Sequence, residues 1–257
     1  MINQKSSNPL FKNKSFTEGE TTLYRTDGTP VEIIDYNNTM TVNGAMGKTA
    51  ILFGLLLLGA VVPFYFGLQG INPIIPGIIS AVIALILVIA ASFSPKNSPY
   101  LAPAYALFEG VFVGAISLIF EVYVMPGIVL QGIAGTLVTF GVCLALYRFG
   151  VVKVTEQFKS VVIASTLAIG TFYLISWILT MFGVTMFHHG NSLMSIGFSI
   201  FVIVIAALNL FLDFDMIEQG AARRQPKYME WFGAMGLMVT LVWLYMEILR
   251  LLSKLKD

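Results

Sequence analysis

Long apolar runs, separated by short stretches of turn-forming residues, dominate the chain from residue 49 onward. No Asp, Glu, Lys or Arg occurs from Thr49 to Pro95, from Val122 to Tyr147 or from Ser160 to Leu212. About 20 apolar residues in a helix cross the hydrocarbon core of a bilayer, so the first and third of these intervals hold two spans each. The pattern predicts an all-α, polytopic membrane protein.

Turn-forming stretches such as GLQGINP (67–73), SPKNSP (94–99) and FHHGNS (187–192) divide the runs into seven spans. The predicted spans are 49–68, 72–93, 101–121, a fourth that follows YVMPG (123–127) and ends at Tyr147, 160–183, a sixth from Ser192 to about Asp213, and a seventh within 232–252. Residues 48–257 therefore form a seven-helix transmembrane domain. Residues 1–47 form a polar tail, in which Asp27-Gly28 gives a weak hairpin signal.

The distribution of Lys and Arg predicts the orientation. Of the 15 Lys and Arg residues, twelve fall on one side of the seven spans, counting the N-terminal tail and every second connection. The connections on the other side hold none. The positive-inside rule then places the N-terminus in the cytoplasm, and we expect a multi-pass protein of the inner membrane. Only Arg250, Lys254 and Lys256 disagree, so the last segment either crosses as an exception or re-enters the membrane and returns.

Composition supports this class and excludes others. Charged residues make up 11% of the chain, against about a quarter in soluble domains. The net charge is +1 without a basic stripe, so nucleic acid is not an expected partner. Cys143 is the only cysteine, which excludes an intramolecular disulfide.

Two aspartates at the end of the sixth run, in LFLDFDMIEQG (210–220), raise the question of whether they share a role. At about 100° per residue, one stripe of the helix carries small and polar residues along its whole length. These are Ser192, Ser195, Ser199, Ala206, Asn209 and Asp213. Asp215 falls about 160° from Asp213. We therefore expect Asp213 to face the bundle and Asp215 to point away from it.

Two more acids lie on stripes of small residues. In the seventh span, Glu247 shares a stripe with Gly233, Gly236 and Thr240, and Arg250 follows three residues later as a charge partner. In the third span, Glu109 borders a GxxxG pattern, which favours close helix packing.

An ionisable group inside a bilayer costs about 2.5–3.5 kcal/mol to insert, so such a group is a functional candidate by default. The candidate ion-pathway residues are Asp213, Glu247, Glu109 and Asn209. The alternative is structural: a hydrogen bond from Asn209 to a neighbouring helix, or a Glu247–Arg250 pair buried for packing.

The order of motifs along residues 40–257 resembles the transmembrane Bax inhibitor motif family, in its bacterial Bax-inhibitor-like branch. LDFDMIEQG (212–220) is similar to the family's aspartate-containing end of the sixth helix, and LYMEILRLL (244–252) to its seventh helix. YALFEG (105–110), MPGIVLQGIAGT (125–136) and LALYRFGVVKVT (144–155) extend the resemblance.

The resemblance implies a seven-helix bundle that acts as a pH-sensitive calcium leak. In that family one acid on each of the last two helices forms a hydrogen-bonded, proton-gated pair, which here would be Asp213 and Glu247. Two carboxylates in contact at low dielectric do not both ionise cheaply, so a shared proton holds them together. Calcium prefers six to eight oxygen ligands, so these acids and Asn209 suit a passing ion. We expect no cofactor and no permanent metal, only transient Ca²⁺.

Enzymatic alternatives lack the residues that they need. An intramembrane aspartyl protease needs aspartates on two spans, and a Ser/His protease needs an intramembrane histidine, whereas His188 and His189 fall in a connection. No mid-span lysine would hold retinal. We predict that the chain is not an enzyme. The remaining alternative is a non-conducting regulator that binds another membrane protein, such as a membrane protease, through small-residue faces.

Overall fold

The computed structural model describes residues 23–24, 30–31, 38–184 and 186–256. Within these residues, seven helices are long and apolar enough to cross a membrane. They are α2 (Val42–Leu68), α3 (Ile74–Phe93), α4 (Ser98–Tyr123), α5 (Ile128–Arg148), α6 (Glu156–Met181), α7 (Leu193–Ala222) and α8 (Met229–Leu255), with short 3-10 helices η3 (Pro95–Asn97) and η4 (Phe187–His189). The predicted all-α seven-helix class is confirmed.

The chain divides into two units, Met1–Thr39 and Met40–Asp257, and all seven helices belong to the second. In the first unit, β1 (Leu23–Tyr24) and β2 (Pro30–Val31) pair antiparallel, with Leu23 opposite Val31. The pairing brackets the weak hairpin signal, although Asp27 and Gly28 themselves lie outside the described residues.

The predicted end of the sixth span needs correction, and the seventh segment does not re-enter. α7 continues to Ala222, nine residues beyond Asp213, because Ile217 and Gly220 are still buried against neighbouring side chains. Asp213 is therefore not in the last turn of its helix. α8 is continuous over 27 residues, about 40 Å of helix, which is enough to cross a bilayer without re-entering.

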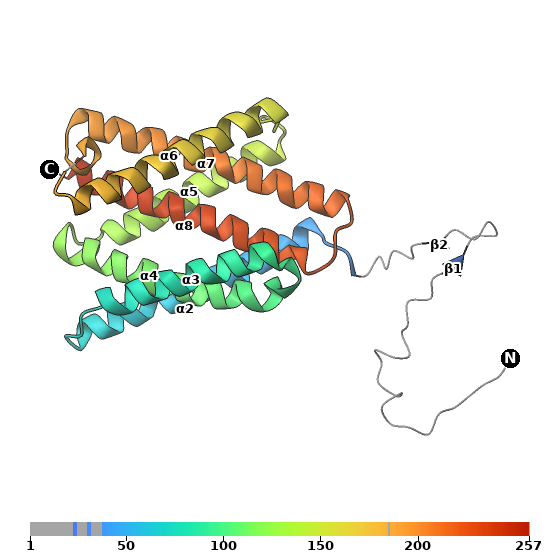
Figure 1. The fold of residues 1–257 in the computed structure, drawn as a ribbon, viewed down its shortest axis with the longest axis horizontal. Coiled ribbons are helices and arrows are strands. Elements are labelled where there is room, and N and C mark those ends of the chain that lie inside the picture. Colours follow the sequence, from blue (N-terminus) through green and yellow to red (C-terminus); the bar gives the residue numbers. More distant parts are fainter. Residues whose placement is uncertain (1–22, 25–29, 32–37, 185, 257) are drawn as a thin grey trace, which may run out of the picture. The chain divides into compact units, whose positions relative to one another are not determined.

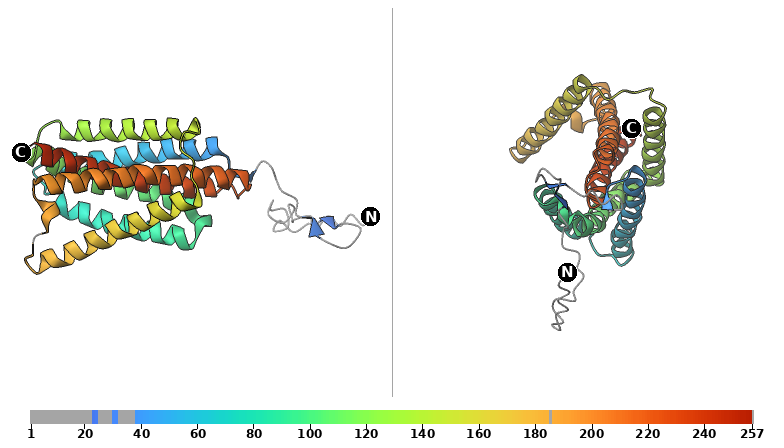
Figure 2. Two further views of the ribbon diagram at one scale, coloured as in Figure 1. Left: turned by 90° about the horizontal axis from the view of Figure 1, so that it is seen from above. Right: turned by 90° about the vertical axis from the view of Figure 1, so that its right-hand side faces the viewer.

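α8 is the central helix of the bundle. It packs against α2, α4, α5 and α7, whereas α3 packs on α4 and α6 packs on α7. Figure 1 and the two views of Figure 2 show the other helices arranged around it. α2 and α8 begin at the same end, which we call the near end, because Glu230 at the start of α8 bonds to Thr41 and Lys48 at the start of α2. The opposite end is the far end.

Glycines allow α2 and α4 to approach closely. A Cβ on Gly110 would lie 2.2 Å from the backbone oxygen of Leu56, and one on Gly114 would lie 2.3 Å from that of Ala60. A Cβ on Gly59 would likewise lie 2.3 Å from the backbone oxygen of Leu107. The GxxxG pattern of α4 thus forms a backbone-to-backbone contact, which is the role such patterns have in membrane helices.

We predict that Gly110→Ala destabilises the bundle, because the added methyl group can only be relieved by moving backbone. The expected loss is about 1–3 kcal/mol, the usual cost of overpacking. Gly141→Ala on α5 is the matched control, since a Cβ there meets nothing within 4 Å. Thermal denaturation of the detergent-purified variants measures the difference. Equal melting temperatures for the two variants would contradict the close approach.

Candidate functional site

Most of the small and polar stripe of α7 faces the interior of the bundle, although Ser192 at its start is exposed. Ser195, Ser199 and Ala206 are between 0% and 1% exposed. At the far end, the ammonium group of Lys254 on α8 donates to the Ser199 hydroxyl at 2.7 Å and to the backbone oxygen of Ser195 at 3.3 Å. This part of the stripe, at Ser195 and Ser199, therefore packs on α8.

The contacts along this stripe fix the register of α7 against α8. Lys254 lies level with Ser199, and Thr240 lies beside the carboxylate of Asp213. The sequence distance from Ser199 to Asp213 on α7 equals the sequence distance from Thr240 to Lys254 on α8. The two contacts therefore agree with one antiparallel alignment of the helices. Glu247, midway between Thr240 and Lys254, therefore lies level with Ala206. That is seven residues from Asp213, or about 10 Å along the helix.

Asp213 has an incompletely satisfied carboxylate. Its Oδ2 is buried and has no hydrogen-bond partner among the described residues. A polar side chain beside the carboxylate is that of Thr240 on α8, which is uncharged. A buried polar oxygen without a partner costs about 1–3 kcal/mol. This site is consequently a place where a proton or a cation would find an unused ligand.

Asp215 has a different environment. It forms an ion pair with Lys159 at the start of α6, at 3.0 Å, and accepts a hydrogen bond from Gln219 at 2.6 Å. Lys159 also pairs with Glu156 on its own helix. The two aspartates face different helices, so Asp215 ties α7 to α6 while Asp213 faces α8.

Glu247 is held in a network with Arg250 and Tyr173. The Arg250 guanidinium donates to both carboxylate oxygens of Glu247, at 2.8 and 3.0 Å, and to the Tyr173 hydroxyl at 2.6 Å. Tyr173, on α6, in turn donates to Glu247 at 3.1 Å. The predicted charge partner Arg250 thus contacts Glu247. Among the described residues no hydrogen bond or ion pair joins Asp213 to Glu247, so their pairing stays a prediction.

Lys254 is a buried cation that our sequence reasoning did not select. It is 6% exposed, and no carboxylate of the described residues lies within ion-pair distance of it. A signal was present, since Glu247, Arg250 and Lys254 are spaced three and four residues apart and share one face of a helix. Together they give the far half of the α7–α8 interface two cations and one anion.

The other candidates occupy two different places. Asn209 donates to the Thr166 hydroxyl on α6 and to the backbone oxygen of Ile205, both at 2.8 Å, so it joins α7 to α6. Glu109 on α4 is half-buried and lies near Tyr105. Ser117 of α4 forms a hydrogen bond with Tyr245 of α8, and this alignment places Glu109 level with Leu237 of α8. Leu237 is only about three residues closer to the near end than Thr240. Glu109 and Asp213 therefore lie at similar depths.

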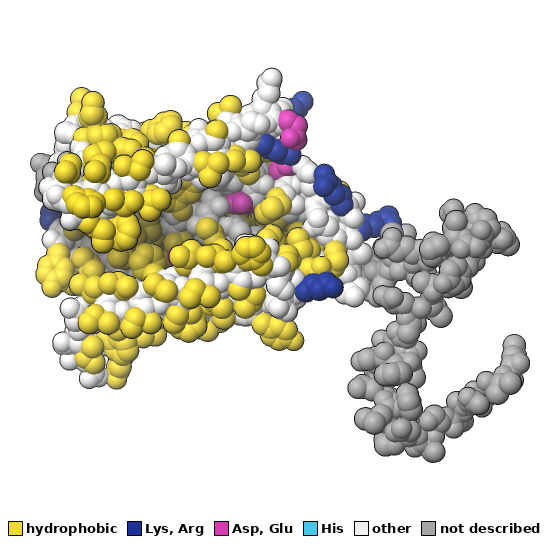
Figure 3. All heavy atoms as spheres, viewed as in Figure 1, with side chains coloured by type: hydrophobic (Ala, Val, Ile, Leu, Met, Phe, Trp, Pro, Cys, Tyr) yellow, Lys and Arg dark blue, Asp and Glu magenta, His cyan; other side chains and the backbone are white. Residues whose placement is uncertain are grey.

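One face of the bundle is hollowed. Figure 3 shows the hollow between the helices labelled α6 and α7 in Figure 1 and those labelled α3 and α4, with an acidic side chain at its floor. Val239 of α8 is 39% exposed, although its neighbours on the central helix are mostly buried. The central helix is therefore not completely covered by its neighbours.

Glu230 is a second residue that sequence reasoning missed. It is fully buried at the near end of α8, where it accepts hydrogen bonds from the backbone N–H and hydroxyl of Thr41 and pairs with Lys48 at 2.6 Å and Lys227 at 2.9 Å. An acid in the first turn of a helix is common, since it complements the helix dipole, and so attracted no attention. Its partners show a structural role, which is to fasten α2 to α8.

His188 is buried rather than exposed in its connection. Its Nε2 lies 3.4 Å from the Ser176 hydroxyl, and the rings of Phe172, Phe187 and Phe198 pack around it. This crowded Ser–His contact resembles packing more than a hydrolytic site. Across the described residues, no group of three or more His, Cys, Asp or Glu side chains is arranged to hold a metal ion.

Comparison with known proteins gives one match. A family model described as "Bax inhibitor 1 like" matches residues 8–257, nearly the whole chain. Neither the curated proteins nor the solved structures that were compared contain a match.

We predict that Arg250→Gln destabilises the protein by about 1.5–3 kcal/mol, because it leaves the buried Glu247 carboxylate without its strongest donor. Lys256→Gln, an exposed change near the same helix end, should alter stability by less than about 0.5 kcal/mol. The double change Glu247→Gln with Arg250→Gln should recover part of the loss. Denaturation in detergent measures all three, and equal behaviour of the two single variants would contradict the network.

Proposed function

This chain belongs to the Bax inhibitor 1 like family, and on that premise we propose that it is a pH-sensitive cation leak, with calcium as a carried ion. The ion pathway follows the α7–α8 interface. Asp213 is its proton-sensing site near the middle of the membrane, Glu109 lies at a similar depth, and Glu247 is a second acid farther along.

The observation that carries this proposal is the buried, unpartnered Oδ2 of Asp213. An intramembrane carboxylate is expensive, and the other charged groups on this interface have bonding partners in the described structure. An ionised Asp213 attracts a cation, whereas the protonated form does not. Proton occupancy at this one side chain therefore changes the affinity of the pathway for cations.

The far half of the interface supports a closed conformation. A cation that leaves Asp213 toward the far end meets Arg250 and Lys254, which repel it, while Glu247 is neutralised by Arg250. Asp213 and Glu247 then act in series on one pathway, about 10 Å apart. Opening requires Arg250 to release Glu247, so that the second acid also faces the ion.

The donors suit a passing ion. Calcium takes six to eight oxygen ligands, and Asp213 and Thr240 at this interface offer fewer, even with Glu109 of α4 at a similar depth. Transient binding followed by release is what permeation needs, because a tightly bound ion does not leave.

The alternative is a non-conducting regulator of another membrane protein. One observation favours it: Ala164 and Ala168 of α6, a small-xxx-small pair, are exposed on a helix that packs mainly on α7 and reaches α8 through Tyr173. Such pairs support helix–helix association in membranes. Ion flux through the purified protein in liposomes separates the two functions, since a regulator gives none. Neither function is enzymatic.

We further propose that the near end is cytoplasmic, which places the N-terminus inside. Figure 3 shows cationic side chains gathered at that end, in agreement with the predicted orientation. The C-terminal exception has a physical reason, because two of its three cations are bonded within the bundle, Arg250 to Glu247 and Lys254 to Ser199. Because the fold holds these two cations, they differ from the free loop and tail charges that keep a segment in the cytoplasm.

The orientation predicts that alkaline phosphatase is active when fused after residue 126, 191 or 257 and inactive when fused after residue 97, 152 or 225. The enzyme folds only outside the cytoplasm, so its activity reports the side of each connection. Activity after residue 225 combined with inactivity after 191 would reverse the orientation.

The function predicts that Asp213→Asn abolishes the pH dependence of calcium flux into liposomes between about pH 5 and pH 8, because the titrating carboxylate is gone. Asp215→Asn is the matched control on the same helix and should keep the pH dependence, with flux within about twofold, since a partly exposed ion pair contributes little.

Glu247→Gln should also flatten the pH profile, and the double variant should be little worse than either single one, because the two acids act on one pathway. Independent, additive effects would show that Glu247 is not on that pathway. Equal effects of Asp213→Asn and Asp215→Asn would refute the role of Asp213.

A further inference from the structure

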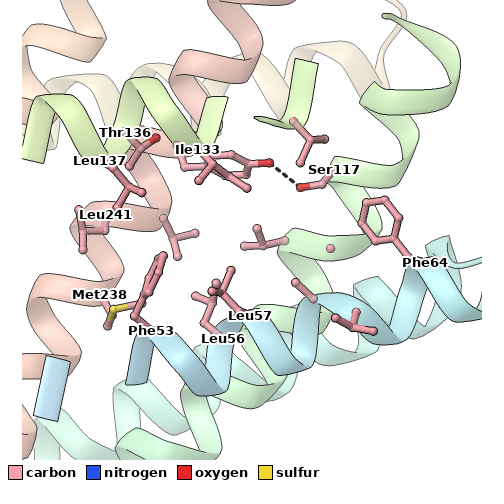
Figure 4. A pocket seen from close by; sticks show the side chains of 17 residues that line it. Phe53, Leu56, Leu57, Phe64, Ser117, Ile133, Thr136, Leu137, Met238 and Leu241 are labelled. Atoms are coloured by element: carbon pink, nitrogen blue, oxygen red, sulfur yellow. Dashed lines mark hydrogen bonds between the residues drawn. The ribbon is translucent and has the colours of Figure 1, made fainter. Parts of the chain in front are cut away.

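Helices α2 and α5 leave a gap between them on the side of the bundle away from α6. α2 packs on α4 and α8, and α5 packs on α7 and α8, but α2 and α5 do not pack closely on each other in the described part of the chain. A cavity of about 310 Å³ lies in this gap, with α4 and α8 as its floor. Figure 4 shows the side chains of α2 and α5 facing each other across it.

The wall of this cavity suits hydrocarbon. The polar side chains that line it have their hydroxyl groups engaged: Ser117 with Tyr245 at 2.7 Å, and Thr136 with the backbone oxygen of Gly132 at 2.7 Å. The remaining lining is aliphatic or aromatic, for example Phe53, Leu56 and Ile133. A guest here gains apolar contact and meets no polar group in need of a partner.

The cavity opens sideways, toward the bilayer. Leu57 and Val61 on α2 and Leu137 on α5 line it and are 42%, 62% and 46% exposed. In a membrane-spanning bundle, side chains exposed at this depth face lipid tails. An acyl chain therefore enters the cavity directly from the bilayer, without crossing water.

A second cavity, of about 440 Å³, lies in the same gap at the near end. It is lined by Val42, Asn43 and Met46 of α2, Leu144, Tyr147 and Arg148 of α5, and Phe214, Ile217 and Glu218 of α7. Its wall carries one cation and one anion, so we call it the polar cavity and the first one the apolar cavity. Arg148 is exposed and makes no ion pair with another described residue, and Glu218 accepts a hydrogen bond from the Tyr147 hydroxyl.

The two cavities are spaced as the parts of one lipid molecule. On α2 the lining passes from Met46 in the polar cavity to Phe53 in the apolar one, and on α5 from Leu144 to Leu137. Both intervals are seven residues, or about 10 Å of helix. A phospholipid whose headgroup occupies the polar cavity therefore extends one acyl chain along the gap into the apolar cavity.

We propose that the gap between α2 and α5 is a binding site for one aminophospholipid, with its phosphate at Arg148, its ammonium at Glu218 and one acyl chain in the apolar cavity. The charges select this headgroup class. Arg148 binds phosphate oxygens through its planar guanidinium, and Glu218 attracts a primary ammonium. A lipid such as phosphatidylglycerol, whose headgroup ends in uncharged hydroxyl groups, leaves the Glu218 carboxylate without a cation and binds less well. This site is independent of ion permeation.

The first test measures lipid binding to the full-length, delipidated protein by native mass spectrometry. Phosphatidylethanolamine and phosphatidylglycerol with identical chains are added separately. We expect one tightly held phosphatidylethanolamine, with phosphatidylglycerol bound at least about tenfold more weakly. Arg148→Gln should lower phosphatidylethanolamine binding by about tenfold or more, the effect of losing a charged hydrogen bond. Arg223→Gln, an exposed arginine that does not line either cavity, should leave binding unchanged.

The second test fills the apolar cavity. Ile133→Trp on α5 lines the cavity and should reduce the same binding by about tenfold, whereas Val138→Trp, which is 66% exposed and outside the lining, should not. Circular dichroism and melting temperature confirm that each variant folds. Equal binding of the two lipids together with no effect of Arg148→Gln would show only loosely associated bilayer lipid and overturn the proposal. Unchanged binding in a folded Ile133→Trp variant would also overturn it.

Discussion

The position of α8 at the centre of the bundle is the constraint on which the other features depend. A central helix in a membrane has neither water nor lipid headgroups for its polar side chains, so each must find a partner on a neighbouring helix. Glu230 does so with Lys48 of α2, Glu247 with Tyr173 of α6 as well as Arg250, and Lys254 with Ser199 of α7. These contacts fix how the neighbours sit around α8 and in what register.

Asp213 stands apart from this scheme. It reaches α8 from α7 and lies beside an uncharged hydroxyl, with one oxygen still without a partner in the described structure. Membrane proteins tolerate such a cost where a group must exchange a proton or an ion. The cations beyond it, at Arg250 and Lys254, keep the far half unfavourable for a cation. In the proposed function, the same interface thus combines an attractive site with an electrostatic barrier, which is the arrangement that the leak would require when closed.

The sequence predicted much of the fold, because long apolar runs and the small-residue stripes report directly on burial. Helical periodicity also separated Asp213 from Asp215, which bond to different helices. It did not give the depth of Glu247 relative to Asp213, because depth depends on the register between two helices, and periodicity describes each helix alone. Lys254 and Glu230 were missed for a related reason. A cation near a C-terminus and an acid in a first turn are ordinary on an exposed helix, and only the central position of α8 makes them buried.

Infrared difference spectroscopy of the reconstituted protein tests the central claim most directly, which is that one buried carboxylic acid at Asp213 exchanges the proton that controls cation passage. The account predicts a protonated-carboxyl band that disappears as pH rises, in step with the change in cation flux. The band should be absent in Asp213→Asn and retained in Asp215→Asn. A pH-dependent band that persists in Asp213→Asn, or one that titrates without any change in flux, would contradict the account.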